Sequence, residues 1–410
     1  MDYAEATEYI RGIEKYGSVL GLDNMRRLTA ELGNVENTLN IIHIAGTNGK
    51  GSCGAFIDAI LRDAGYSVCR YVSPAVFEYR EHFQYNGENI TEDELAAVIS
   101  RVRRAADNIC PHPTVFEVET AAAFLYCTDK KCDYAILETG MGGRYDAVNI
   151  ISKSKMSVIT SIGMDHTAFL GDTIEKIAYE KAGIIKENGS VVSAVQIKAA
   201  ADVIEDVCIE KHARLTVADK LSNIRQNVFD YDDMRDVKIS LNGAFQPYNA
   251  AAAIEVCTEL GISEEHIRCG LANTKWRGRF ETICENPLII ADGAHNPAAA
   301  AALADTIREN FGGKRLNFIM GVLKDKEYNK IAALTAPLAD MIYTVTPDNA
   351  RALNAKSLAD AVRVYNKNVE ATDIKTAVKK CAADKERVTI AFGSLSYLGD
   401  LTKAVENEKV

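Results

Sequence analysis

Residues 40–52 read Asn-Ile-Ile-His-Ile-Ala-Gly-Thr-Asn-Gly-Lys-Gly-Ser, so a glycine-rich turn directly follows an apolar run. Residues 40–45 predict a buried strand, and residues 52–64 predict a helix that ends at Gly65. Where a strand runs through such a turn into a helix, backbone N–H groups at the helix N-terminus can hold phosphate oxygens. This stretch therefore predicts the opening of a nucleotide-binding α/β domain.

Within the turn, Lys50 can place a point charge on the β- and γ-phosphates, and Ser52 can offer a hydroxyl to Mg²⁺. The spacing departs from the common phosphate-loop pattern, because Gly51 stands between Lys50 and Ser52. A glycine-rich turn with an incidental lysine is the alternative interpretation. The nucleotide-binding candidates in the loop are Thr47, Asn48, Gly49, Lys50, Gly51 and Ser52.

Outward from this loop, apolar runs at 67–72, 134–137 and 157–161 alternate with helical patterns at 120–128 and 174–185. Such alternation predicts a mostly parallel sheet covered by helices on both faces. A second series of strands and helices follows at 287–291, 297–310, 316–321, 325–335, 341–345 and 388–392. The predicted fold class is α/β: a P-loop-type domain over residues 1–285 and a smaller Rossmann-like domain over 286–410.

The remaining bulk features narrow the class of protein. The 410 residues are 47% hydrophobic with a net charge of −10, which favours a globular protein without a nucleic-acid or anionic-membrane surface. Residues 4–33 are predicted to form a helical lead before the first strand. Neither a signal peptide nor a span of 18 apolar residues is evident, so the cytoplasm is the expected compartment. A monomer is the default expectation. The ten cysteines lack a C-x-x-C pair, Cys127 and Cys132 being closest, and are expected to be reduced thiols.

Several motifs together resemble the folylpolyglutamate synthase and dihydrofolate synthase family, a branch of the Mur ligases. The loop at 43–52 matches that family's phosphate loop, including the extra Gly51. The other matching segments follow in the family's order at 73–74, 114–117, 137–149, 163–166, 180–184, 246–250, 276–281 and 292–297. Ala75 and His82 depart from the histidine and arginine that the family often carries there.

The resemblance implies ATP and Mg²⁺, with two metal positions, as cofactors. Ser73, Glu138 and His166 would be metal ligands together with Ser52, and oxygen-rich sets of this kind suit Mg²⁺. Glu138 and His166 also follow predicted strands, where parallel sheets bind ligands. A solvated strand-end carboxylate and a structural histidine are the alternatives.

Lys181 is unusual without any resemblance. Asp172 and Glu175 predict a capping box, and the helix that follows puts Ile177 and Ala178 on the face of Lys181. An ammonium on an apolar face is costly unless it is paired or modified. The resemblance implies carbamylation of Lys181; a lysine that extends past the helix edge to solvent is the alternative.

Further roles come from the resemblance alone. Asn249 and Arg279 from the first domain and Asp292 from the second would hold ATP, and His295 would bind glutamate or orient its amine. Residues 292–297 equally fit a turn and helix start with Asn296 as N-cap and Pro297 as first residue. The folate-type substrate would contact Thr114, Arg144, Tyr145, Asp146 and Ala147.

Together these features predict ATP-dependent ligation of L-glutamate to dihydropteroate or a folate through an acyl phosphate, with Lys50, Lys181 and His295 as catalytic residues. A Mur-type peptidoglycan ligase is the first alternative, although only a short lead precedes the loop. A nucleotide-binding regulator without catalysis is the second. The sequence leaves the choice of acceptor open.

Overall fold

A computed structural model describes residues 1–17 and 21–408, and its contacts divide the chain into two compact units. The first unit comprises residues 1–75, 79–240 and 247–274, and the second comprises 76–78, 241–246 and 275–410. The main segment of the second unit thus begins at Lys275, whereas the sequence places a boundary at 285/286. The assignment of separate roles to residues 1–285 and 286–410 stays a prediction.

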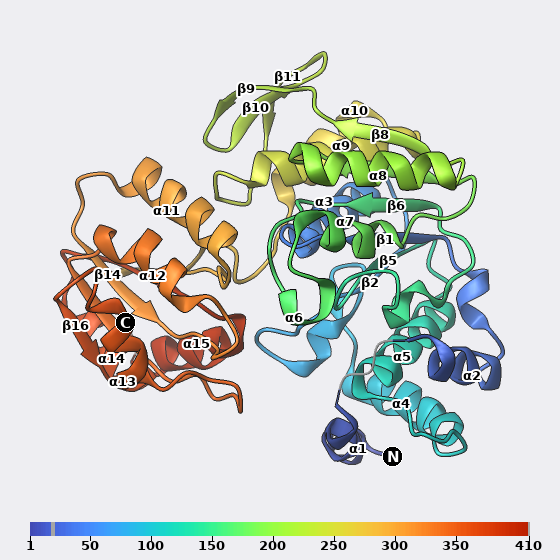
Figure 1. Cartoon of the computed structure of the whole chain (residues 1–410), viewed down its shortest axis with the longest axis horizontal. Helices are drawn as coiled ribbons and strands as arrows, with labels where there is room; N and C mark the ends of the chain where they lie inside the picture. The colour runs from blue at the N-terminus through green and yellow to red at the C-terminus, as the bar shows by residue number, and fades with distance from the viewer. Residues whose placement is uncertain (18–20, 409–410) are drawn as a thin grey trace. The chain divides into compact units, whose positions relative to one another are not determined.

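The first unit is built on a sheet that has eight strands in the described residues, in the order β4-β3-β2-β5-β1-β6-β7-β8 (Figure 1). The neighbours in the series β2-β5-β1-β6-β7-β8 run parallel, whereas β3 pairs antiparallel with both β2 and β4. The strands are β1 (Ile41–Ala45), β2 (Val68–Tyr71), β3 (Phe83–Tyr85), β4 (Glu88–Asn89), β5 (Tyr134–Glu138), β6 (Met156–Ile159), β7 (Ser190–Ala194) and β8 (Arg214–Ala218). The predicted parallel sheet is confirmed.

The central strands of this sheet are buried along their whole length, because helices cover both of its faces. On one face Ile41 packs into a core with helices α1 (Tyr3–Ile13), α2 (Asp23–Glu31), α4 (Glu92–Ala106) and α5 (Val115–Lys130). On the other, Ile44 and Ile136 lie against Gly54 of α3 (Lys50–Asp63). Farther along, α7 (Ile174–Ala182) and α8 (Lys198–Glu210) share a core with β6 and β7.

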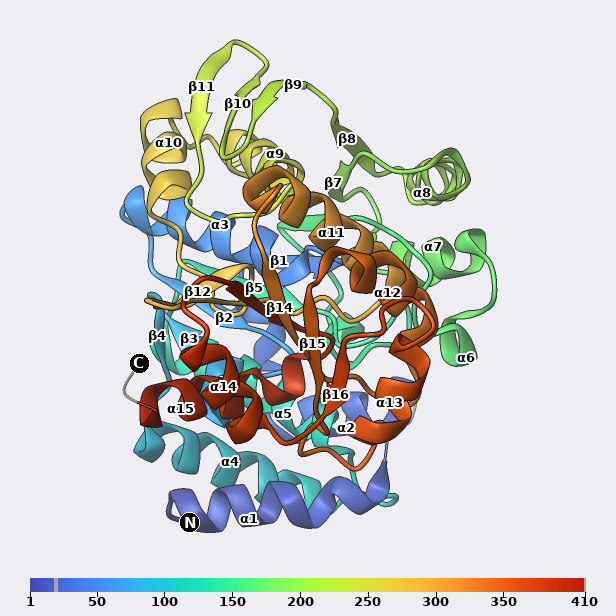
Figure 2. The ribbon, with the colours of Figure 1, turned by 90° about the vertical axis from the view of Figure 1, so that its left-hand side faces the viewer.

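The helical lead predicted over residues 4–33 is interrupted. Helix α1 ends at Ile13, a short 3₁₀ turn follows over Glu14–Tyr16, and α2 begins at Asp23. Residues 18–20 of the predicted lead lie outside the described residues. Helix α1 lies along α4, as Figures 1 and 2 show. Among the described residues, no helix has the length and apolarity to cross a membrane.

Helix α3 is closely packed against α10 (Glu264–Asn273). A Cβ on Gly270 would collide with the backbone of Ile60 in α3, so the two helices approach at a residue without a side chain. Because α3 carries the phosphate loop at its N-terminus, α10 indirectly holds that loop in place; α9 (Gln246–Glu259) precedes α10 in the chain.

Replacing Gly270 with valine should therefore destabilise the first unit. Overpacking of a core costs about 1–3 kcal/mol, and backbone atoms cannot move aside as a side chain can. Chemical denaturation should show a lower midpoint for the variant, while Ala272→Val, at an exposed position of the same helix, should leave it nearly unchanged. Equal midpoints in the two variants would contradict the close approach.

A small antiparallel sheet follows β8 and was not predicted from the sequence. It has the order β11-β10-β9 within the described residues, with strands Leu221–Arg225 (β9), Val228–Tyr231 (β10) and Met234–Lys238 (β11). The largely exposed β9 and β11 carry few apolar residues, so this part of the chain lacks the hydrophobic pattern on which strand prediction depends.

The second unit contains a sheet of order β12-β13-β17-β14-β15-β16 in the part of the chain that the structure describes. Only β12 is antiparallel to its neighbour. The strands are β12 (Glu281–Glu285), β13 (Leu288–Ala291), β14 (Leu316–Met320), β15 (Met341–Thr344), β16 (Val369–Ala371) and β17 (Val388–Phe392). The helices are α11 (Pro297–Phe311), α12 (Tyr328–Thr335), α13 (Ala355–Val362), α14 (Ile374–Ala383) and α15 (Leu398–Asn407). The Rossmann-like prediction is confirmed.

Candidate active site

The carboxyl ends of four neighbouring strands of the first unit carry most of the predicted site residues. The phosphate loop follows β1, Ser73 follows β2, Glu138 ends β5, and Asp165 and His166 follow β6. In the sheet these strands lie in the order β2-β5-β1-β6, so segments far apart in sequence end at one edge. The connection from β1 leads to β2 on one side, and the connection from β5 leads to β6 on the other, so the strand order reverses direction here, which is where open α/β sheets bind ligands.

The phosphate loop is closed tightly by its neighbours. A Cβ on Gly46 would collide with the Thr160 hydroxyl, and one on Gly49 would collide with the side-chain oxygen of Asn249. Gly49 also has φ of +89°, a conformation that favours glycine. Asn249, in α9, therefore lies against the phosphate loop; its predicted contact with ATP stays a prediction.

Hydrogen bonds tie the same loop to the segment after β6. The backbone N–H groups of Thr47 and Asn48 donate to the Ser161 carbonyl at 2.8 and 3.2 Å. The Thr47 hydroxyl donates to the Gly163 carbonyl at 3.0 Å and accepts from the Gly163 N–H at 3.0 Å. Thr47 thus has a structural role in fixing the loop, in addition to its predicted contact with nucleotide.

Lys50 is the first residue of α3, and its side chain folds back over the loop. Its Nζ donates to the Gly46 carbonyl at 3.2 Å and lies 3.7 Å from Oε1 of Glu138. The side chains of Lys50 and Glu138 are only 15% and 11% exposed, so their charges are weakly screened by water. Cation, carboxylate and helix N-terminus therefore meet in one place. Ser52, in the first turn of α3, is buried.

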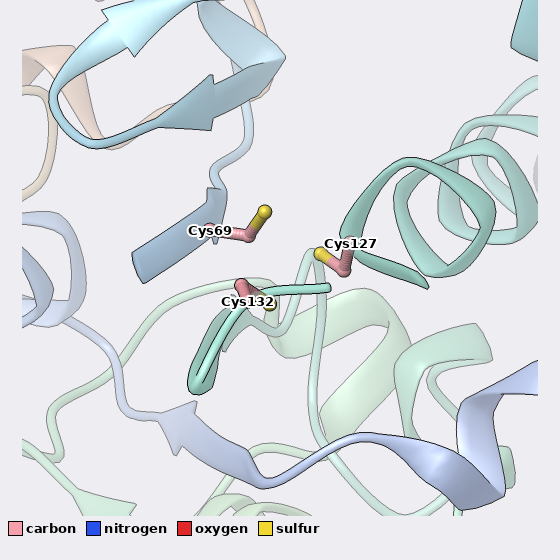
Figure 3. Close-up of side chains that lie close together, drawn as sticks. All are labelled: Cys69, Cys127 and Cys132. Carbon is pink, nitrogen blue, oxygen red and sulfur yellow. The ribbon is translucent and has the colours of Figure 1, made fainter. Parts of the chain in front are cut away.

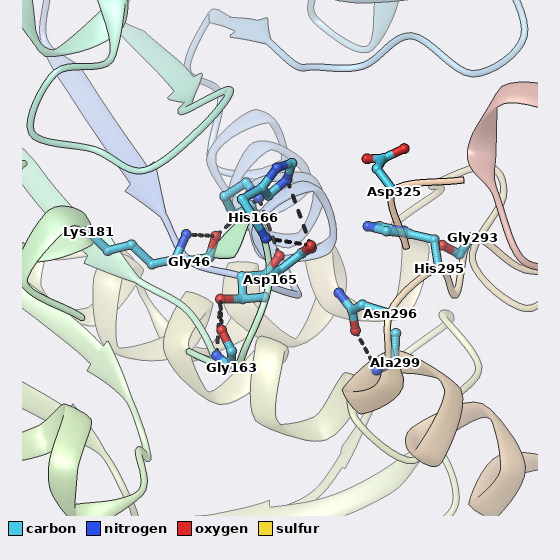
Figure 4. A network of polar contacts seen from close by, with 12 residues as sticks. Gly46, Gly163, Asp165, His166, Lys181, Gly293, His295, Asn296, Ala299 and Asp325 are labelled. Carbon is cyan, nitrogen blue, oxygen red and sulfur yellow. Dashed lines mark hydrogen bonds and ion pairs between the residues drawn. The ribbon is translucent and has the colours of Figure 1, made fainter. Parts of the chain in front are cut away.

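Lys181 reaches the same loop from α7. Its Nζ donates to the Gly46 carbonyl at 2.8 Å, and the side chain is buried (Figure 4). Burial, followed by the nearby charge of Lys50, lowers its pKa to about 7, against the opposing effect of Asp165 and Asp146. The amine is therefore partly neutral at physiological pH, which makes it a nucleophile toward carbon dioxide. The predicted capping box is wrong: Thr173 is the N-cap of α7 and accepts from the Lys176 N–H.

The segment after β6 contributes a carboxylate that sequence reasoning did not single out. Asp165 Oδ1 accepts from the His166 N–H at 2.8 Å, and Oδ2 lies 3.9 Å from His166 Nε2 (Figure 4). Of the two carboxylates that act to raise the pKa of Lys181, Asp165 has the larger effect. Its place in the motif at 163–166, directly before the predicted ligand His166, was the available signal.

The loop that connects β5 to β6 is organised around Asp146. Its carboxylate accepts from the Met141 and Val148 N–H groups, each at 3.0 Å, and burial raises its pKa to about 6. Arg144 lies over the Tyr179 ring at 3.9 Å, and Tyr145 is 50% exposed. The structure therefore shows Asp146 shaping this loop; substrate contacts of Arg144, Tyr145, Asp146 and Ala147 stay predictions.

Thr114 is the N-cap of α5 and forms a capping box with Glu117. Its hydroxyl accepts from the Glu117 N–H at 3.3 Å and donates to Glu117 Oε2 at 2.9 Å. Thr114 thus caps α5, and its contact with substrate stays a prediction.

The two departures from the family pattern fall before β3. His82 is buried, and its Nδ1–H donates to the Val72 carbonyl at 2.7 Å, among the rings of Tyr71 and Tyr79. Ala75 offers no polar atom where a histidine would.

Arg279 lies in the second unit, not in the first domain to which the sequence assigned it. It precedes β12, whereas Asp292 and His295 follow β13, and the three residues lie near one another. Asp292 accepts from the Phe280 N–H at 2.9 Å and the Ala294 N–H at 2.8 Å, and burial raises its pKa while Arg279 opposes that rise. A Cβ on Gly293 would collide with the Arg279 guanidinium. His295 Nδ1–H donates to the Gly293 carbonyl at 2.8 Å, so in the neutral ring Nε2 is the acceptor. Asn296 caps α11 and Pro297 begins it, as the turn-and-helix interpretation predicted.

Comparison with known proteins defines the class first. Residues 44–257 match the Mur ligase middle domain, and residues 278–395 match the Mur ligase glutamate ligase domain. A dihydrofolate synthase/folylpolyglutamate synthase of Bacillus subtilis (strain 168) is 35% identical over 431 aligned residues, which cover 98% of this chain and 99% of the relative.

Solved structures agree with this class. Escherichia coli FolC in complex with DHPP and ADP is 29% identical, with a TM-score of 0.91 over 100% of this chain and 99% of that one. Mycobacterium tuberculosis folylpolyglutamate synthase complexed with ADP and AMPPCP is 27% identical, with a TM-score of 0.90 and coverages of 100% and 99%. The chain belongs to the dihydrofolate synthase/folylpolyglutamate synthase family within the Mur ligases, and the resemblance read from its motifs is confirmed.

Proposed function

We propose that this chain is an ATP-dependent ligase that joins L-glutamate to the carboxylate of dihydropteroate, a reduced folate, or both. The observation that carries this function is the meeting of Lys50, Lys181 and Glu138 at the phosphate loop. Two lysines on the Gly46 carbonyl form a site for an anion as highly charged as a nucleoside triphosphate. The relatives named above, whose names state folate ligation and whose complexes hold ADP, support the same function.

The chemistry needs a leaving group on the acceptor. A carboxylate oxygen attacks the γ-phosphorus of ATP, ADP leaves, and the resulting acyl phosphate is attacked by the glutamate amine to give an amide and phosphate. Lys50 stabilises the charge on the transferred phosphoryl group. Arg279 offers a second, planar cation. His295 Nε2, as an acceptor, holds a proton of the incoming amine and so directs its lone pair.

The donor set at the strand ends fits Mg²⁺. Ser52, Ser73, Glu138 and His166 offer hydroxyl, carboxylate and imidazole groups, and Asp165 adds a second carboxylate, a mainly oxygen set of the kind that Mg²⁺ prefers. Bound there with the nucleotide, Mg²⁺ would neutralise phosphate charge during the transfer. Glu138 orients this set, because its contact with Lys50 fixes one side of the carboxylate.

Lys181 completes the proposal as a carbamylated residue. Its neutral amine attacks the carbon of CO₂, and loss of one proton leaves a carbamate with a single negative charge. That charge would replace a buried cation next to Lys50 with an anion, which removes the repulsion that lowers the lysine pKa.

The assay that tests the function measures glutamate-dependent ADP formation with Mg·ATP and offers dihydropteroate and tetrahydrofolate separately. Turnover with dihydropteroate alone identifies a dihydrofolate synthase, with tetrahydrofolate alone a polyglutamylating enzyme, and with both a bifunctional one. ATP binding without turnover on either acceptor overturns the folate assignment in favour of a peptidoglycan-type ligase or a noncatalytic regulator. The cytoplasmic compartment and the monomeric state stay predictions.

Thr114 allows a test of substrate contact against helix capping. Thr114→Ala and Thr91→Ala each remove the N-cap of a capping box, at the starts of α5 and α4, and each should cost about 1 kcal/mol of unfolding free energy. If Thr114 also binds the acceptor, Thr114→Ala raises the acceptor KM, whereas Thr91→Ala leaves it unchanged. Steady-state kinetics at matched folded fractions decide this; equal KM values in both variants restrict Thr114 to capping.

A further inference from the structure

Three cysteine thiols gather in the first unit, at the opposite ends of the strands from the candidate active site. Cys69 lies near the start of β2, Cys127 in the last turn of α5, and Cys132 in the turn between α5 and β5 (Figure 3). Their Sγ atoms all lie within 4.8 Å of one another. Lys131 takes a left-handed conformation where α5 ends, and the reversal brings Cys132 back beside Cys127.

The surroundings of this thiol cluster are those of a formed site. Cys69 and Cys127 are buried in the main apolar core of the unit, and Cys132 packs against that core while remaining partly exposed. An ion could therefore enter beside Cys132 without opening the core.

Three sulfur ligands without carboxylate or imidazole are a selective donor set. Thiolates favour soft ions, whereas Mg²⁺ and Ca²⁺ require oxygen. Sulfur ligands about 2.3 Å from a common ion lie about 4 Å from each other, so the observed grouping needs little movement to bind one.

We propose that Cys69, Cys127 and Cys132 bind one divalent d¹⁰ ion of the Zn²⁺ type, with a fourth position open to solvent beside Cys132. On binding, the three thiols release their protons, so the M²⁺ trithiolate complex carries a net charge of −1. The ion connects β2, α5 and the start of β5, and it stabilises the fold of the first unit. This site is separate from the ligase chemistry and does not depend on the proposed function.

The test uses the full chain, reduced and freed of metal with a chelator, and Cd²⁺ as the probe. Sulfur-to-cadmium charge-transfer absorption reports thiolate ligands only, so oxygen and nitrogen donors at the phosphate loop do not contribute. A band that saturates at one equivalent, protection of three thiols from alkylation and a rise in Tm are expected. Absence of the band in the reduced wild type overturns the proposal, and so does formation of a Cys127–Cys132 disulfide without metal binding.

Variants identify the ligands. Loss of an outer partner of a metal site already costs about 10–100-fold in affinity, so Cys132→Ser, which removes a ligand, should weaken Cd²⁺ binding at least about 100-fold. Cys110→Ser, at an exposed cysteine outside the cluster, should bind as the wild type does. Wild-type affinity in Cys132→Ser overturns the site. If Cys132→Ser does not fold, mapping of the alkylation-protected cysteines in the wild type gives the same decision.

Discussion

Replacing Lys50 with alanine is expected to reduce kcat/KM for ATP by about 10³-fold, equivalent to about 4 kcal/mol of transition-state stabilisation. Lys50 is the first residue of α3 and brings its ammonium to the Gly46 carbonyl and Glu138. The side chain is mostly shielded from water, so no solvent cation can take its place at the same distance. Steady-state ADP release at varied ATP measures the effect.

The control for Lys50→Ala is Lys153→Ala, an exposed lysine of the same unit. It should leave both kcat/KM and Tm unchanged, and the activity of Lys50→Ala is compared with it at matched folded fractions. Activity within about tenfold of the wild type in Lys50→Ala would show that the loop holds no phosphate. The variant should also raise the pKa of Lys181, because the neighbouring charge that helps to lower it is gone.

Replacing Lys181 with methionine should reduce turnover by about 10²–10³-fold and yet maintain or increase Tm at neutral pH. Methionine fills a similar volume, and it removes a cation that is buried against its preference for water. Lys176→Met, at an exposed position of the same helix, should change neither quantity. Full activity in Lys181→Met would exclude any chemical role for this residue.

The stability of the wild type relative to Lys181→Met should change with pH in a definite direction. The pKa of Lys181 is about 7 in the folded chain and close to 10.5 when unfolded. Between these values the unfolded chain binds more protons, so the stability of the wild type relative to Lys181→Met rises as pH increases from 7 toward 10.5. Below pH 7 the penalty is complete. Denaturation midpoints across this range measure the difference, and a flat profile would contradict the low pKa.

Carbamylation of Lys181 has its own readout. With ¹³C-bicarbonate, the wild type should show one carbamate carbon signal that is absent from Lys181→Met and lost on acidification. The carbamate would also remove the pH dependence described above, so the stability series should be run both with and without bicarbonate. No signal in the wild type would leave Lys181 as an unmodified buried amine.

Many of the strands, turns and helix starts could be predicted from the sequence, for a physical reason. Strands such as Ile41–Ala45 and Val388–Phe392 are buried on both faces and therefore read as continuous apolar runs, and the turn at 46–51 needs glycines that are visible as such. Asn296 and Pro297 predict the start of α11 by local hydrogen bonding alone. Exposed strands such as β9 and β11 were not predicted, because no buried face imposes a hydrophobic pattern on them.

Proximity, by contrast, was decided by the tertiary structure. The motifs contain Lys50, Glu138 and Lys181 separately. Only the strand order β2-β5-β1-β6 and the packing of α7 bring the two lysines to the Gly46 carbonyl and Glu138 to Lys50. The same holds for Thr114, whose hydroxyl proves to cap a helix, and for Cys69, which spacing never linked to Cys127 and Cys132. Sequence determined which local structures and chemical groups exist here; long-range packing decided which groups meet, since contacts between distant segments depend on the whole sheet and not on neighbours along the chain.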